Sequence, residues 1–90
     1  MERRRESRIS ANTPVTVTLQ GMLGDPQISG NVLDMAGSGL RLRTALPLPS
    51  GARVKVETAR TLMLGEVVRC EPLGAGYALG LALSEVRARS

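Results

Sequence analysis

The chain has 90 residues, a net charge of +4 and 42% hydrophobic residues, which suits one small domain with a modest hydrophobic core. It contains no histidine, which excludes hydrolases with an imidazole base and zinc sites with histidine ligands, and Cys70 is its single cysteine. Because this cysteine has no partner, we expect a reduced, half-buried thiol, which fits a cytoplasmic protein. No apolar run approaches the roughly 20 residues of a membrane-spanning helix, so we expect a soluble chain.

The amino end is strongly basic. Eleven of the twelve basic residues are arginines, and four of these lie within the first eight positions. Arginine pairs with phosphate through two hydrogen bonds and also stacks on purine rings. Residues 1–12 are polar and lack strand periodicity, so we expect a flexible basic arm followed by a folded domain over residues 13–90. A plain disordered tail is the alternative interpretation.

Short segments with alternating polarity follow the arm and predict β-strands. Turn residues separate them, among them Pro47, Pro49 and the run Gly74-Ala-Gly76. The six predicted strands span residues 15–19, 28–33, 40–43, 53–57, 62–70 and 77–83.

Six strands at this spacing predict an all-β fold, a six-stranded antiparallel β-barrel that closes to hide its edges. Gly65 and Gly80 lie inside strand patterns, where glycine predicts a bulge or a bend. Residues 84–90 allow at most a short C-terminal helix, with Ser84 as its N-cap.

Two motifs point to a ligand. An arginine pair four positions apart, Arg4 and Arg8, precedes the first predicted strand, and the sequence Asp-Met-Ala-Gly-Ser-Gly occupies residues 34–39, where the second strand turns into the third. A carboxylate followed by small residues fits a binding turn, although a plain hairpin turn has the same composition.

With these motifs in this order, and with the ending Gly-Tyr-Ala-Leu-Gly-Leu-Ala-Leu, the chain resembles the PilZ domain family, which consists of bacterial receptors for the second messenger cyclic di-GMP. The resemblance implies a cyclic di-GMP site with no metal and no other cofactor. It also implies a ligand-responsive adaptor for an unknown effector protein rather than an enzyme. The site residues that it implies are Arg4, Arg5, Arg8, Asp34, Ala36 and Gly39.

Ala36 departs from the family pattern, which has serine at this position in most members that bind the nucleotide. The resemblance implies that the serine hydroxyl makes a hydrogen bond at the ligand. Loss of such a bond to a charged group costs about 1.5–3 kcal/mol, or roughly 10- to 100-fold in affinity. We therefore expect binding that is weakened, with Ser38 as a possible substitute.

The chemistry of the ligand agrees with this assignment. Cyclic di-GMP has two phosphodiester charges and two guanine bases. Arg4 and Arg8 can donate to phosphate or to guanine O6 and N7, and Asp34 can accept hydrogen bonds from guanine N1 and N2. We expect the ligand to neutralise the arm and to order it against the barrel.

Two other classes of function remain open. Because of Ala36, the chain is also compatible with a degenerate module of the same fold that contacts proteins and binds no nucleotide. Its arginines allow a nucleic-acid binder, but Tyr77 is the single aromatic residue, whereas single-strand binders stack bases on several. Catalysis is disfavoured because Asp34 has no evident carboxylate or imidazole partner.

Overall fold

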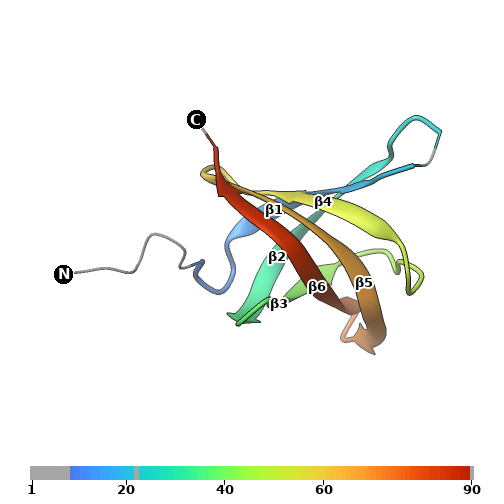
Figure 1. Ribbon diagram of the computed structural model, residues 1–90. Coiled ribbons are helices and arrows are strands. Elements are labelled where there is room, and N and C mark those ends of the chain that lie inside the picture. The colour runs from blue at the N-terminus through green and yellow to red at the C-terminus, as the bar shows by residue number, and fades with distance from the viewer. Residues whose placement is uncertain (1–8, 22, 90) are drawn as a thin grey trace.

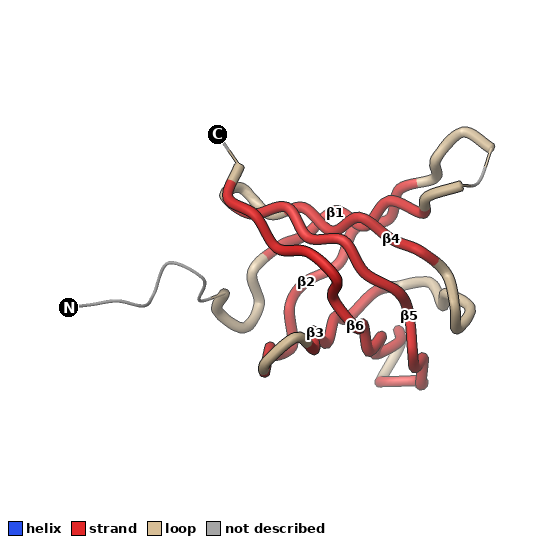
Figure 2. Tube along the Cα trace, viewed as in Figure 1, coloured by secondary structure: helices blue, strands red, loops and turns tan. Residues whose placement is uncertain are grey.

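The computed structural model describes residues 9–21 and 23–89, which form six antiparallel strands. The strands are β1 (Pro14–Leu19), β2 (Gln27–Ala36), β3 (Gly39–Thr44), β4 (Arg53–Glu57), β5 (Thr61–Leu73) and β6 (Gly76–Ala88). They close into a barrel in the order β1-β2-β3-β6-β5-β4, with β4 paired to β1 (Figure 1). The predicted fold class is confirmed, and Figure 2 shows only strand and loop in the described part of the chain.

The core fills the barrel with the inward residues of every strand. The fully buried side chains are aliphatic, namely Val17, Val32, Leu40, Leu42, Val54, Val56, Met63, Val67 and Leu79. Alternation along the strands produces this arrangement, because Leu40 and Leu42 point inward while Arg41 between them is exposed. Cys70 is half-buried against this core and is a free thiol, as expected.

Strands β5 and β6 are longer than the sequence pattern predicted. The short helix allowed for residues 84–90 does not begin at Ser84, because β6 continues to Ala88 and Thr61 of β5 pairs with that residue. The pairing register skips Ser84, whose hydroxyl donates to the carbonyl of Leu64 at 3.3 Å. Strand β5 thus provides backbone hydrogen-bond partners for the end of β6, and a local capping pattern cannot reveal partners that are distant in the sequence.

Irregular pairing accompanies Gly65 and Gly80, the two glycines for which the sequence pattern predicted a bulge or a bend. The register of β5 against β6 shifts between Leu64 and Gly65, and again between Val67 and Arg69, which faces Gly80. A Cβ added at Gly65 would lie 2.6 Å from the carbonyl oxygen of Ala82, so only glycine fits there. The expected bulge at Gly65 is confirmed.

One end of the barrel gathers segments that are distant in the sequence. Because neighbouring strands are antiparallel, the start of β1, the β2–β3 turn, the β4–β5 loop and the end of β6 all lie at this end, which is on the left in Figure 1. We call it the arm end, since the described residues that precede β1 lie there as well. It also holds the motif at residues 34–39.

Candidate functional site

The motif at residues 34–39 is mostly strand. The sequence pattern ended the second strand at residue 33, but β2 runs to Ala36, which pairs with Gly39. Only Gly37 and Ser38 form the turn, and Gly37 has a φ of 59°. A two-residue hairpin loop with positive φ at its first residue has the backbone signs of a type II′ turn, which favours glycine there.

A bulge determines which way Asp34 points. Val32 pairs with Leu42 inside the barrel, whereas Asp34 pairs with Arg41 outside it, so Leu33 is the extra residue. Without this bulge, strict alternation would place Asp34 on the same inward face as Val32. The bulge therefore brings the Asp34 carboxylate to the outer surface, as a binding role requires.

The Asp34 carboxylate is held by Arg41. The Nε atom of Arg41 donates to Oδ1 at 3.0 Å and to Oδ2 at 3.2 Å, and Nη2 donates to Oδ2 at 2.6 Å. These hydrogen bonds hold the pKa of the Asp34 carboxyl below its ordinary value of 3.8 and raise that of the Arg41 guanidinium. Sequence analysis missed this partner, and the signal for it was the exposed position of Arg41 within Leu40-Arg41-Leu42.

The remaining motif residues are exposed or partly exposed beside the turn. Ala36 lies on the outer surface of β2, and the carbonyl of Ser38 accepts a hydrogen bond from the Leu83 amide at 2.8 Å, which fastens the turn to β6. Gly39 has no positive φ, and a Cβ there would come no closer than 3.4 Å to any residue beyond its two chain neighbours. The fold therefore requires glycine at position 37 but not at position 39.

Arg4, Arg5 and Arg8 lie outside the described residues. The structure does describe the segment that follows them. Ile9 is half-buried and packs against the core, and the Asn12 amide donates to the carbonyl of Val32 at 2.7 Å. The Val32 amide in turn donates to the carbonyl of Thr13 at 2.9 Å. The arm thus joins the barrel along β2, two residues from Asp34.

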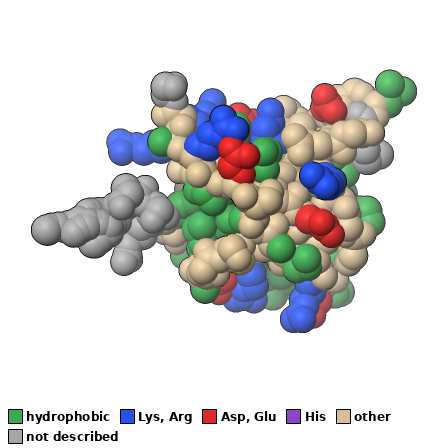
Figure 3. Space-filling model, viewed as in Figure 1, with side chains coloured by type: hydrophobic (Ala, Val, Ile, Leu, Met, Phe, Trp, Pro, Cys, Tyr) green, Lys and Arg blue, Asp and Glu red, His purple; other side chains and the backbone are tan. Residues whose placement is uncertain are grey.

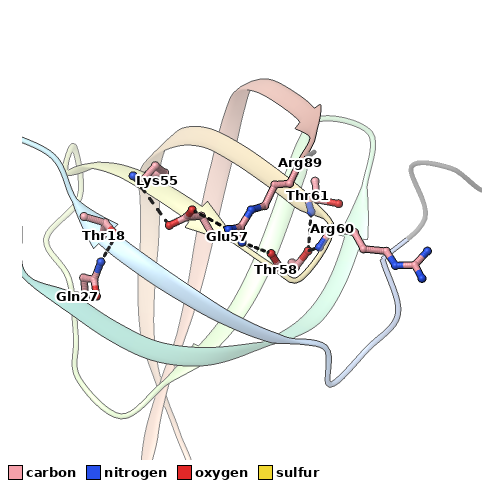
Figure 4. A network of polar contacts seen from close by, with 8 residues as sticks. All are labelled: Thr18, Gln27, Lys55, Glu57, Thr58, Arg60, Thr61 and Arg89. Carbon is pink, nitrogen blue, oxygen red and sulfur yellow. Dashed lines mark hydrogen bonds and ion pairs between the residues drawn. The ribbon is translucent and has the colours of Figure 1, made fainter.

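A second polar cluster fastens the end of β6 to the β4–β5 loop (Figure 4). The buried Thr58 hydroxyl accepts hydrogen bonds from the Arg60 amide at 3.1 Å and the Thr61 amide at 2.9 Å. Arg89 donates from Nη1 to the carbonyl of Thr58 at 2.7 Å, and its Nη2 lies 3.9 Å from Glu57. These contacts close a loop, so we assign this cluster a structural role.

Charge on the barrel surface is mixed. Figure 3 shows basic side chains gathered near the C-terminal end of β6, with acidic side chains among them. Within residues 9–21 and 23–89 no group of three acidic or cysteine side chains is arranged to hold a metal ion. The same residues include no helix long and apolar enough to cross a bilayer.

Comparison with protein families gives one match. The family model described as the PilZ domain matches residues 2–90, which is nearly the whole chain. Neither the curated proteins nor the solved structures contain a match to the sequence.

Proposed function

The chain belongs to the PilZ domain family, which is known for binding cyclic di-GMP, and on this premise we propose that it binds cyclic di-GMP at the arm end of the barrel. In this proposal Arg4, Arg5 and Arg8 approach the nucleotide from one side, and the β2–β3 hairpin approaches it from the other. The family is one of ligand-binding adaptor domains rather than catalysts, so the output is a change in a contact with an effector protein.

The observation that carries the proposal is the attachment of the arm to β2. Asn12 and Thr13 are hydrogen-bonded to Val32, and Ile9 is packed on the core. Each residue of extended chain spans at most about 3.5 Å, so Arg4 is within roughly 18 Å of Ile9. This reach allows the arginines to approach the face of β2 that presents Asp34, which supports the proposal.

The chemistry of the hairpin suits a guanine base. Asp34 presents two carboxylate oxygens on the outer surface, and they can accept from N1–H and N2–H of guanine. Gly39 has no side chain to keep a ligand from the backbone, and the fold itself does not need glycine there. Ala36 offers no hydroxyl, so one hydrogen bond to the ligand is missing.

We further propose that binding orders the arm. The arm carries four arginines against two glutamates, and neutralisation of this excess positive charge by two phosphodiesters would let the arm lie across the barrel and form a new surface for a cytoplasmic effector. Amide exchange of residues 2–10 tests this step. Slower exchange at saturating cyclic di-GMP is expected, and unchanged exchange would exclude an ordering switch.

A second candidate function has a specific observation in its favour. Ala36 lacks the hydroxyl of the family motif, and the Asp34 carboxylate is already engaged in an ion pair with Arg41. Both features fit a module that has kept the barrel for protein contacts and no longer binds nucleotide.

Calorimetric titration of the unmodified chain and of Ala36→Ser with cyclic di-GMP separates the two candidates. If the proposal holds, both bind, and restoring the hydroxyl tightens binding by about 10- to 100-fold. Ala36→Val at the same exposed position is the control, because it adds bulk without a hydroxyl and should not tighten binding. If none of the three proteins binds, the protein-contact module is the better account.

A further inference from the structure

The ion pair between Asp34 and Arg41 joins the ligand site to the neighbouring strand. We propose that Arg41 is an internal competitor of the nucleotide, because its guanidinium occupies the two carboxylate oxygens that guanine needs and must leave before the base can bind. This inference rests on the proposed function, since it concerns how that site is regulated. Arg41 belongs to neither the arginine motif at residues 4–8 nor the hairpin motif at residues 34–39, so neither motif assigns it a role.

The contact has the geometry of a guanine contact. Nε–H and Nη2–H of Arg41 are two parallel donors on one edge, and they engage Oδ1 and Oδ2 of Asp34 side by side. Guanine presents N1–H and N2–H in the same way, as two parallel donors on one edge. One carboxylate cannot accept both edges in its plane at once, so base and guanidinium compete for it.

The pair is exposed enough to be displaced. The side chains of Arg41 and Asp34 are 59% and 56% exposed, and an ion pair in such a setting is weakened by water and salt. A buried pair would instead lock the carboxylate, because separation would leave a charge without solvent. The competition therefore lowers the affinity for the nucleotide only modestly and does not abolish binding.

A released Arg41 has room and a second acidic neighbour. Arg41 is paired with Gly80 of β6, so no side chain at the paired position blocks its rotation. The pKa of Arg41 is raised first by its hydrogen bonds to Asp34 and also by the charge of Glu71 on β5. Glu71 is thus within electrostatic reach of a guanidinium that turns away from the ligand.

Titration with cyclic di-GMP of the unmodified chain, Arg41→Met and Arg69→Met tests this competition. Arg69 is the matched control because it lies on the other side of Gly80, is 73% exposed and forms its own exposed ion pair, with Glu71 at 3.9 Å rather than with Asp34. Both variants remove one positive charge from the same face, but only Arg41→Met frees the Asp34 carboxylate. We expect Arg41→Met to bind two- to fivefold more tightly than Arg69→Met, the scale of an exposed ion pair.

Each outcome bears on one of the two claims. If Arg41→Met binds no more tightly than Arg69→Met, Arg41 is not a competitor. If none of the three proteins binds cyclic di-GMP, the proposed function itself is wrong. Cyclic di-AMP is the control ligand, because adenine lacks the paired N1–H and N2–H donors, and Arg41→Met should give it no such gain.

The Nε–H signal of Arg41 in nitrogen-15 NMR spectra offers a second measurement. Saturating cyclic di-GMP should move this signal toward its position in Asp34→Asn, where the charged acceptor is absent. Melting temperatures of the variants check that each remains folded. A ligand-saturated Arg41 signal identical to that of the free protein would show an intact pair and would overturn the inference.

Discussion

The backbone amide of Asn12 donates to the carbonyl of Val32 at 2.7 Å, which ties the residues that follow the arginine motif to the strand that ends in the second motif. Asn12 has a φ of 69°, a left-handed conformation that asparagine tolerates better than most residues. The chain turns here before it enters β1. This contact fastens Asn12, four positions after Arg8, to the strand that carries Asp34.

Arg8→Ala should abolish binding of cyclic di-GMP and leave the melting temperature nearly unchanged. The reason is that the core and the strands hold the fold described for residues 9–21 and 23–89, whereas the proposed role of Arg8 is a charge-assisted contact with the ligand. Calorimetry and circular dichroism measure the two effects. Arg53→Ala, at the start of β4 and the other end of the barrel, is the control and should bind normally. A large fall in melting temperature for Arg8→Ala would make Arg8 a structural residue.

Substitution of the two hairpin glycines should separate binding from folding. Gly39→Ala should keep the melting temperature within a few degrees, since its Cβ has space, but should weaken binding by crowding the ligand. Gly37→Ala should lower stability by about 1 kcal/mol, because alanine disfavours a φ of 59°. Thermal unfolding and calorimetry of both variants give the comparison. Equal affinity in Gly39→Ala and the unmodified chain would place the ligand away from Gly39.

The pKa of the Asp34 carboxyl should lie below 3.8 in the unmodified chain and return close to that value in Arg41→Met. The hydrogen bonds from Arg41 stabilise the charged carboxylate, and their removal leaves an exposed acid. Because the folded-state pKa is depressed, any stabilisation from the pair is present above the ordinary pKa and is lost as pH falls through the folded value. Carbon-13 NMR titration of the carboxyl measures both values. Identical titration in the two proteins would mean that the pair does not persist in solution.

Leu79→Ala should destabilise the barrel by about 2–5 kcal/mol, because it empties part of a core in which Leu79 is fully buried. Leu46→Ala is the matched control, since Leu46 is 57% exposed and the same truncation there leaves no cavity. Chemical denaturation of both variants provides the free energies of unfolding. A loss below 1 kcal/mol for Leu79→Ala would contradict the packing described for β6.

The sequence predicted the strands well where alternation was regular. The predicted bounds of β4, residues 53–57, are those of the structure. Leu40 and Leu42 of β3 point inward, as their alternation with arginine indicates. Local capping signals failed at Ser84 because the partner that extends β6 is β5, a choice that depends on pairing between segments.

The orientation of Asp34 could not be predicted from alternation either. A single extra residue, Leu33, exchanges the inward and outward faces of β2, and nothing in the residues around it specifies that shift. The pairing of Asp34 with Arg41 follows from the shifted register. The residues of the motif could therefore be recognised in the sequence, but the ion pair of the Asp34 carboxylate with Arg41 could not be predicted from it.

Calorimetric titration of the unmodified chain with cyclic di-GMP tests the central claim most directly. The account predicts saturable binding that is lost when residues 1–8 are removed, because the arm arginines and the β2–β3 hairpin hold one ligand together. Absence of binding at millimolar nucleotide, or equal binding with and without residues 1–8, would contradict it.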